Sequence, residues 1–250
     1  VRVKTINQLK DNYSYILHND YNYASVIDPS ESLPIIEYVK KNNLKIKDIF
    51  ITHHHKDHTD GVKSIIKYFP EVNIHSPSLH IENTRFVLRN DDEIQTDINS
   101  FKIISTPGHT LDHIVYLDTY NKILFSGDTL FSLGCGRVFE GTLNQMYSSL
   151  QKLNELEDDI MVYCGHEYTL NNLNFLEKCL NKKNLYSDIR KKIESNLKIR
   201  GNSVPFNLRE EKSYNLFLNQ ESQIGVLVKQ ELKLQNLDLF KYLREKKDNF

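Results

Sequence analysis

The sequence is poor in cysteine and has no long apolar run. Its three cysteines, Cys135, Cys164 and Cys179, are too few for a disulfide framework, so we predict a reducing compartment, the cytoplasm. No run of about 18 apolar residues is present, which excludes a transmembrane helix. The first five residues alternate apolar and polar side chains, and we therefore expect no secretory signal.

An excess of charge of either sign is also missing. The chain has 32 lysines and arginines against 33 aspartates and glutamates. A broad attraction to nucleic acid or to an anionic membrane is therefore not indicated, and we predict neither partner. We also predict a monomer. With 250 residues, the chain is long enough for one large domain, or for one domain and a smaller one, with a real core.

The first two thirds of the chain alternate strand-like and helix-like segments. Runs rich in Ile, Val, Tyr and Phe that end at turn residues predict strands, and apolar side chains at intervals of three and four predict helices. We expect strands at residues 2–7, 13–18, 23–28, 48–52, 72–75, 101–106, 114–118, 122–126 and 160–164. We expect helices at residues 33–42, 61–69 and 142–156.

The pattern changes after about Tyr168. Segments 170–180, 186–199, 215–218 and 237–246 have helical periodicity and many charges, and we see no strand alternation there. We interpret the charged residues 244–248 as a solvated helix face. The sequence therefore predicts the α/β class, with a catalytic domain at residues 1–168 and an all-helical domain at residues 169–250.

The most informative segment is residues 53–58, which read His-His-His-Lys-Asp-His directly after the apolar residues 49–51. No hydrophobic core needs imidazole and carboxylate groups at this density, which is typical of ligands for a transition metal, or for two metals sharing a loop. Alternate residues of a strand share a face. We therefore expect His53 and His55 to face one metal and His54 to point away, with Asp57 and His58 reaching a second metal.

Three further segments place a metal-competent residue just after an apolar strand and a glycine. These residues are His109, Asp128 and His166. Side chains at the ends of several strands can converge on one point. The seven candidate ligands would serve two metals about 3.5–4 Å apart, with Asp128 as a bridge.

A purely structural zinc site explains this set poorly, because such sites favour thiolates and no Cys-x-x-Cys pair is present. We interpret the other histidines as core, surface or supporting residues. Among them, His113 has the strongest case for supporting a metal ligand. The other four are His18, His54, His75 and His80.

The candidate ligands resemble the signature of the metallo-β-lactamase superfamily, His-x-His-x-Asp-His followed by later His, Asp and His. Within it, the chain is similar to glyoxalase II, the hydroxyacylglutathione hydrolases. The features that carry this likeness are Asp11-Asn12-Tyr13 with Tyr15, the stretch from Gly127 to Arg137, the stretch from Gly165 to Thr169, and a helical C-terminal region with Arg209, Lys212 and the ending from Arg244 to Phe250.

The resemblance implies a four-layer αβ/βα metallo-β-lactamase sandwich with an added C-terminal helical domain. It also implies hydrolysis of the thioester S-D-lactoylglutathione to D-lactate and glutathione, by a hydroxide held between two divalent metals. Zinc is the first expectation for both metals, with iron or manganese as alternatives.

The resemblance also assigns roles to individual residues. One metal would take His53, His55 and His109, and the other Asp57, His58 and His166, with Asp128 between them. Asp57 and Asp128 would also be catalytic. Glutathione would be bound by Arg137, Tyr168, Arg209 and Lys212.

Three positions depart from the family pattern, which often has Lys, Tyr and Gly where this chain has Arg137, Phe139 and Asp112. The first rival interpretation is another enzyme of the superfamily, such as a persulfide dioxygenase with one iron, a lactonase or a β-lactamase. The second is a non-catalytic binding protein on the same fold. The complete Asp57 and His58 pair favours two metals, and the filled ligand set favours an enzyme.

Overall fold

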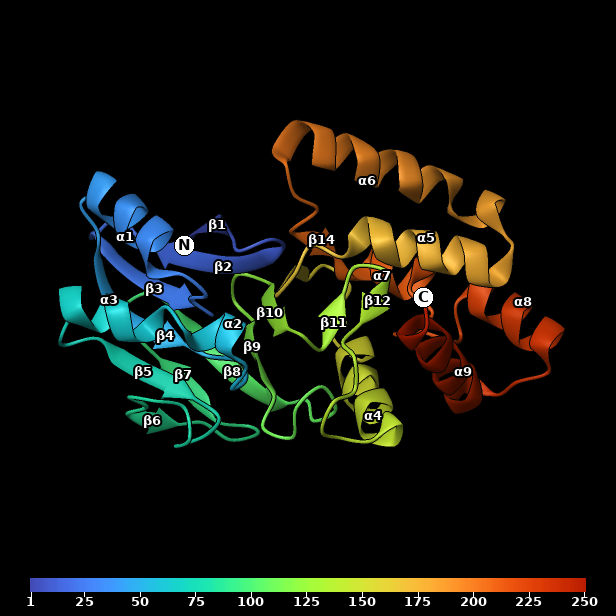
Figure 1. Ribbon diagram of the computed structural model, residues 1–250, viewed down its shortest axis with the longest axis horizontal. Coiled ribbons are helices and arrows are strands. Elements are labelled where there is room, and N and C mark those ends of the chain that lie inside the picture. The colour runs from blue at the N-terminus through green and yellow to red at the C-terminus, as the bar shows by residue number, and fades with distance from the viewer. The chain divides into compact units, whose positions relative to one another are not determined.

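The structure is a computed structural model that describes residues 1–250, and the chain divides into two compact units. Unit 1 comprises residues 1–106 and 112–127, and unit 2 comprises residues 107–111 and 128–250. The elements are labelled along the chain in Figure 1. None of the helices is long and apolar enough to cross a lipid bilayer. The domain boundary between residues 168 and 169 stays a prediction.

The first sheet of unit 1 has the strand order β1-β2-β3-β4-β5-β6. The first three strands pair antiparallel, whereas β3, β4, β5 and β6 run parallel. The sheet is therefore mixed. Its strands are β1 Arg2–Gln8, β2 Asn12–His18, β3 Tyr23–Ile27, β4 Lys45–Phe50, β5 Asn73–Ser76 and β6 Phe86–Val87.

Two helices, α1 (Ser32–Lys41) and α3 (Val62–Tyr68), cover one face of this sheet (Figure 1). Their apolar side chains lie three or four residues apart, as expected of helices with one buried face. Ile35 of α1 and Ile65 of α3 join Ile49 of β4 in one buried cluster. Burial of each such side chain contributes about 1.5–3 kcal/mol, and this packing fixes β4 in the middle of its sheet.

The second sheet of unit 1 contains β7 (Glu93–Gln95), β8 (Ser100–Ser105), β9 (Ile114–Asp118) and β10 (Ile123–Gly127), paired antiparallel in that order. Aromatic rings fill the space between the two sheets. Phe50 meets Phe101 edge-on at 5.1 Å and Tyr116 at 5.3 Å between ring centroids. Unit 1 therefore consists of helices, a mixed sheet and an antiparallel sheet in successive layers.

Unit 2 is mainly helical. Its helices are α4 Leu143–Asn154, α5 Thr169–Leu180, α6 Ser187–Arg200, α7 Leu208–Tyr214, α8 Gln223–Leu232 and α9 Asn236–Asp248, with a 3₁₀ turn at Lys183–Tyr186. The short strands β11 (Leu130–Phe131) and β12 (Gly134–Cys135) form a hairpin, and β13 (Met161–Cys164) pairs with β14 (Phe206–Asn207). Rings of Phe175, Phe217 and Phe240 pack in the core.

The predicted α/β class with a helical C-terminal region is confirmed. Each predicted strand has a counterpart, although β4 ends at Phe50 rather than at residue 52. The short strands β6, β7, β11, β12 and β14 and the helices α2 (Lys56–Thr59), α7 and α8 were not predicted. β14 also contradicts the expectation that no strand follows Tyr168, because two residues are too few to show an alternating pattern.

The predicted helix at residues 215–218 is wrong, because this segment is a turn. The side chain of Asn215 accepts a hydrogen bond from Phe217 N at 3.0 Å, which is the local bonding by which asparagine competes with a helix. Its amide also donates to the carbonyls of Phe131 and Gly134, each at 3.1 Å. Local periodicity is therefore overridden by contacts with the β11–β12 hairpin.

The interpretation of residues 244–248 as a solvated face holds for the exposed Glu245, Lys246 and Asp248 but is wrong for Arg244 and Lys247. Arg244 is only 3% exposed, and its Nη1 donates to the carbonyl of Cys135 at 2.9 Å. Lys247 is half-buried and donates to the side chain of Asn172. The two cations lie three residues apart on α9, so they share the helix face that turns inward.

Candidate metal centre

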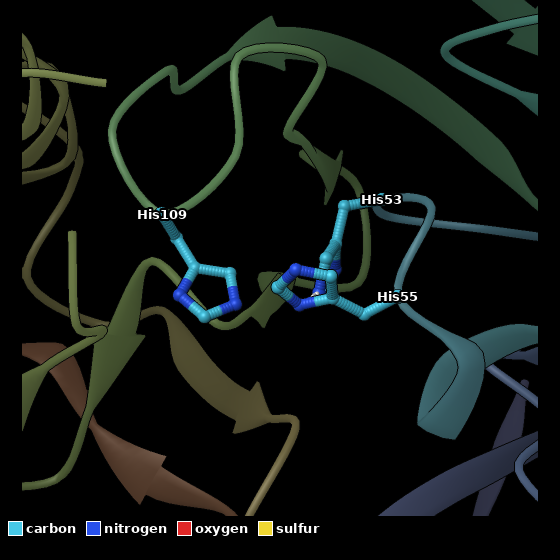
Figure 2. Close-up of side chains that lie close together, drawn as sticks. All are labelled: His53, His55 and His109. Atoms are coloured by element: carbon cyan, nitrogen blue, oxygen red, sulfur yellow. Dashed lines mark hydrogen bonds between the residues drawn. The ribbon is translucent and has the colours of Figure 1, made fainter. Parts of the chain in front are cut away.

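The candidate donors of unit 1 lie between the end of β4 and the short helix α2 (Lys56–Thr59). Because β4 ends at Phe50, His53 and His55 lie on a bend, and strand alternation does not explain how they meet. They nevertheless face each other, with 3.1 Å between His53 Nε2 and His55 Nδ1 and an angle of 74° between the rings. Figure 2 draws both side chains on this bend.

The next two donors are carried by α2. The His58 ring lies 4.2 Å from the His53 ring, centroid to centroid, and Asp57 Oδ2 is 3.8 Å from His58 Nε2. His54 turns elsewhere, as predicted, and its Nδ1 lies 3.0 Å from Oδ1 of Asp112. Asp112, one of the departures from the family pattern, is thus the partner of His54.

A buried carboxylate that we did not predict orients two of these rings. Asp28 is 2% exposed and lies 2.9 Å from His58 Nδ1, and it accepts from Thr52 N and Thr52 Oγ1 at 2.8 and 2.7 Å. Thr52 Oγ1 in turn lies 3.0 Å from His53 Nδ1. The Nδ1 atoms therefore carry the hydrogens, which leaves each Nε2 lone pair available to a metal.

His113 packs on one of these rings, that of His53. The rings of His53 and His113 stack at 4.8 Å, and His113 Nδ1 lies 2.9 Å from Thr106 Oγ1. Gly127 packs against Thr52 and His113 with a φ of 47°. An added Cβ there would lie 2.7 Å from Thr52 Oγ1 and 2.8 Å from His113 Nε2. Only glycine fits here.

The candidate donors of unit 2 are His109, Asp128 and His166, each no more than 5% exposed. Asp128 Oδ2 lies 3.4 Å from His109 Nε2 and 3.3 Å from His166 Nε2. His109 Nδ1 donates to the carbonyl of Arg137 at 2.7 Å, which leaves its Nε2 as the lone-pair atom. Figure 2 also shows the His109 ring on its own loop. One carboxylate oxygen thus lies between two imidazole nitrogens.

The chemistry of both donor sets fits a divalent cation. Buried imidazole nitrogens whose far side is already hydrogen-bonded, together with carboxylate oxygens, are ligands for metals such as zinc or iron. Groups of these histidines and aspartates could hold a metal ion. The set contains no cysteine, and Cys135 and Cys164 are buried free thiols whose pKa values are raised by burial.

Two predicted substrate-binding residues lie beside the donors of unit 2. The Tyr168 ring stacks on His166 with 4.8 Å between centroids and 5° between planes. The Arg137 guanidinium lies 5.5 Å from the centre of the Phe139 ring, and that ring meets His109 at 5.2 Å. Phe139 is 60% exposed, so this aromatic surface next to a candidate metal donor is open to a ligand.

The other two predicted residues, Arg209 and Lys212, both pair with Asp158. Lys212 Nζ donates to Asp158 Oδ1 at 2.7 Å, and Arg209 Nε is 3.7 Å from Asp158 Oδ2. The hydrogen bond from Lys212 lowers the pKa of Asp158. Asp158 precedes β13, whereas His166 follows the other end of that strand. Their role in substrate binding stays a prediction.

Arg137 belongs to a different group of cations, whose other members are on α9. Asp248 Oδ1 is 3.7 Å from Arg137 Nε and 2.9 Å from Arg244 Nη2, so one carboxylate joins the two arginines. Burial lowers the pKa of Lys247, one turn further along α9, to about 7. We call Arg137, Arg244 and Lys247 the α9 cation group. The three-residue spacing of Arg244 and Lys247, which places both on one face of a helix, is the feature of the sequence that could have indicated this group.

Comparison with known proteins agrees with this fold. Residues 9–166 match the family described as Metallo-beta-lactamase superfamily, and the chain therefore belongs to this superfamily. A solved structure, ETHE1 from Myxococcus xanthus, matches with a TM-score of 0.68 and 22% identity, covering 100% of both chains. The predicted metallo-β-lactamase fold is therefore confirmed.

The second comparison narrows the class. Residues 167–250 match the family described as Hydroxyacylglutathione hydrolase C-terminus. The hydroxyacylglutathione hydrolase of Citrobacter koseri is 37% identical, and that of Salmonella paratyphi C is 36% identical, each over 253 residues that cover 100% of both chains. The chain belongs to the hydroxyacylglutathione hydrolase family, as the sequence resemblance indicated.

Proposed function

We propose that the protein hydrolyses S-D-lactoylglutathione to D-lactate and glutathione. The observation that carries this proposal is the Asp128 carboxylate between the imidazoles of His109 and His166, beside a cation group suited to an anionic peptide. The names of the full-length relatives supply the substrate class, a hydroxyacyl thioester of glutathione.

We propose further that the donors of both units close on one pair of divalent cations. One cation would be held by His53, His55 and His109, and the other by Asp57, His58 and His166, with Asp128 bridging. The grouping of these donors as potential metal ligands supports the assignment. Zinc is the metal that we propose for both positions, and iron or manganese would suit the same donors.

Bound divalent cations supply an activated water at neutral pH and polarise a carbonyl. The residues of the chain orient the reaction. Asp57 accepts a hydrogen bond from Asn12 Nδ2 at 3.0 Å, which aims its carboxylate, and we propose that Asp57 holds or accepts the proton of the attacking water. Asn12 belongs to the Asp11-Asn12-Tyr13 motif of the family, and this contact accounts for its presence.

The leaving group needs little help from the protein. A thiol has a pKa of about 8.5, so the glutathione thiolate departs without strong protonation. No side chain is therefore assigned as a separate general acid.

Glutathione carries two carboxylates, and cations recognise them through charge-assisted hydrogen bonds. We propose that Arg137 and Tyr168 contact the glutathione moiety and that Lys247 and Arg244 add positive charge to the same surface. Arg209 and Lys212 remain candidates, although Asp158 already counters their charge. In this account residues 1–168 form the catalytic domain and residues 169–250 the glutathione-binding domain.

We also propose a cytoplasmic monomer. The support for the compartment is chemical, because Cys135 and Cys164 are buried as free thiols and Cys179 is free as well. Size-exclusion chromatography with light scattering tests the monomer.

The test of the activity is a direct assay. Purified, metal-loaded protein is mixed with S-D-lactoylglutathione, and loss of the ultraviolet thioester absorbance is followed. A matched lactoyl thioester of N-acetylcysteamine, which lacks the γ-glutamyl and glycyl carboxylates, serves as the control. We expect turnover of the glutathione thioester with a much higher KM for the control. A fully metallated preparation that leaves both thioesters intact would rule out the proposal.

A further inference from the structure

The β11–β12 hairpin connects a metal donor to a substrate cation. It begins two residues after Asp128 and ends two residues before Arg137. Its strands pair Leu130 with Cys135 and Phe131 with Gly134, and each strand has only two residues. Such a short hairpin has too few hydrogen bonds of its own to hold a fixed position, so contacts with the rest of unit 2 must locate it.

The tip of the hairpin is held by a buried glutamate of α7. Glu211 is 3% exposed and accepts three hydrogen bonds: from Ser132 Oγ and Leu133 N, both at 2.7 Å, and from Asn215 Nδ2 at 3.0 Å. Leu133 has a φ of 57°, a strained value for leucine, and the bond to Glu211 is one that holds it there.

Two asparagines complete the attachment. Asn215, which is fully buried, donates to the carbonyls of Phe131 and Gly134, and Asn172 donates to the carbonyl of Ser132 at 2.8 Å. A Cβ on Gly134 would lie 2.5 Å from the Asn172 amide. The polar groups at the tip are therefore bonded to side chains of α5, α7 and the turn after α7, none of which belongs to the candidate metal centre.

At the other end, the hairpin meets the metal donors closely. Gly136 N donates to Thr129 O, and a Cβ on Gly136 would lie 1.9 Å from the carbonyl oxygen of Asp128 and 3.2 Å from His109 Nδ1. The carbonyl of Arg137 accepts the hydrogen bond of His109 Nδ1. A shift of the hairpin would therefore move Asp128 through the chain and His109 through this bond.

We propose that Glu211 and Asn215 are positioning residues for the metal centre. They anchor the tip of the hairpin, and its base sets the places of Asp128, His109 and Arg137. The C-terminal helices would thus tune metal binding through α7, in addition to any contact with the substrate. This inference rests on the proposed metal centre, but it does not depend on which thioester is cleaved.

The experiment measures Zn²⁺ affinity by competition with a chromophoric chelator, in the full-length protein. We expect Glu211→Ala and Asn215→Ala to weaken Zn²⁺ binding by about tenfold or more, the usual effect of removing a group that orients a ligand. Glu211→Gln should restore most of the affinity. Its amide oxygen can still accept from Leu133 N, and its NH₂ can donate to the Ser132 hydroxyl, which both donates and accepts.

Glu177→Ala is the matched control. Glu177 is also a buried glutamate of unit 2, 7% exposed, but it bonds to Arg190 at 2.7 and 3.0 Å rather than to the hairpin. We expect Glu177→Ala to lower the melting temperature and to leave Zn²⁺ affinity within about twofold of the unmodified protein.

If Glu211→Ala and Asn215→Ala do not fold, Ser132→Ala decides the question, because it removes only the hydroxyl bond to Glu211. A fall in Zn²⁺ affinity then supports the inference. Folded variants that bind Zn²⁺ as tightly as the unmodified protein, or a control that loses as much affinity as Glu211→Ala, would overturn it. If the unmodified protein shows no thioesterase activity while Glu211→Ala and Asn215→Ala still lose Zn²⁺ affinity, the proposed substrate is rejected and the positioning role is kept.

Discussion

The ring of Tyr168 lies parallel to the imidazole of His166, with 4.8 Å between centroids and 5° between planes. Tyr168 also meets Phe131 edge-on at 5.2 Å, so its ring is held between the candidate metal donor His166 and the β11–β12 hairpin. One side chain thus has two separable parts: the ring, which orients His166, and the hydroxyl, which we propose for the substrate.

Substitution of Tyr168 can separate these two parts. We expect Tyr168→Phe to keep the full metal content and to raise KM, because only a hydroxyl is lost. Tyr168→Ala should also weaken metal binding, because the His166 ring loses its stacking partner. Metal analysis and steady-state kinetics on both variants check this. Equal metal loss in both would contradict the assignment of orientation to the ring.

Asp128→Ala tests the bridge. The carboxylate lies between His109 and His166, and its removal takes away the oxygen that we propose both cations share. We expect loss of activity together with a lower metal-to-protein ratio, measured by inductively coupled plasma mass spectrometry. An inactive variant with an unchanged ratio would show that Asp128 acts in the reaction without bridging.

The α9 cation group and the pair Arg209 and Lys212 predict different effects on KM. We expect Lys247→Ala to raise KM by about tenfold with little change in kcat, when assayed below pH 7 where Lys247 is charged, because positive charge near a remote part of the substrate is lost. Arg209→Ala should raise KM by less than about threefold, because Arg209 is exposed and already near Asp158. A larger effect from Arg209 than from Lys247 would restore Arg209 as the main glutathione contact.

Two buried groups should make stability depend on pH in opposite directions. Burial raises the pKa of Glu211 from 4.5 to about 7. Between these values the folded protein keeps a proton that the unfolded chain releases, so the free energy of unfolding falls as the pH rises to about 7. Burial lowers the pKa of Lys247 from 10.5 to about 7, so the free energy of unfolding rises again between about 7 and 10.5.

The titrations of Glu211 and Lys247 together predict a minimum in the free energy of unfolding near neutral pH. Urea unfolding at pH values of about 5, 7 and 9 measures it. Glu211→Gln should remove the fall on the acid side, and Lys247→Met should remove the rise on the alkaline side. Identical pH dependence in the unmodified protein and both variants would show that neither pKa is shifted as described.

Much of the fold was predictable from local pattern. The long strands are apolar runs that end at turn residues, and α1, α4 and α5 have apolar side chains at helical spacing. The hairpin β11–β12 was not predictable, because two-residue strands have no period and are held by Glu211 and Asn215, about 80 residues further along. The turn at Asn215 was missed because it too depends on bonds to distant residues, the carbonyls of Phe131 and Gly134.

The candidate site shows the same division. The types and order of the metal donors follow from the density of His and Asp after apolar strands, although their roles stay predictions. The bend that carries His53 and His55 was mistaken for the end of a strand. Asp28 was missed because its partner His58 lies 30 residues away, and a lone Asp-Pro pair is indistinguishable from a turn. Arg244 was missed because burial of a charged tail depends on tertiary packing.

A metal titration shows whether hydrolysis of the thioester requires two divalent cations. Metal-free protein is titrated with Zn²⁺ while bound metal and hydrolysis of S-D-lactoylglutathione are measured on the same samples. We expect two equivalents of Zn²⁺ per chain at saturation, with full activity only after the second binds. Saturation at one equivalent, or two bound equivalents without hydrolysis, would contradict the account.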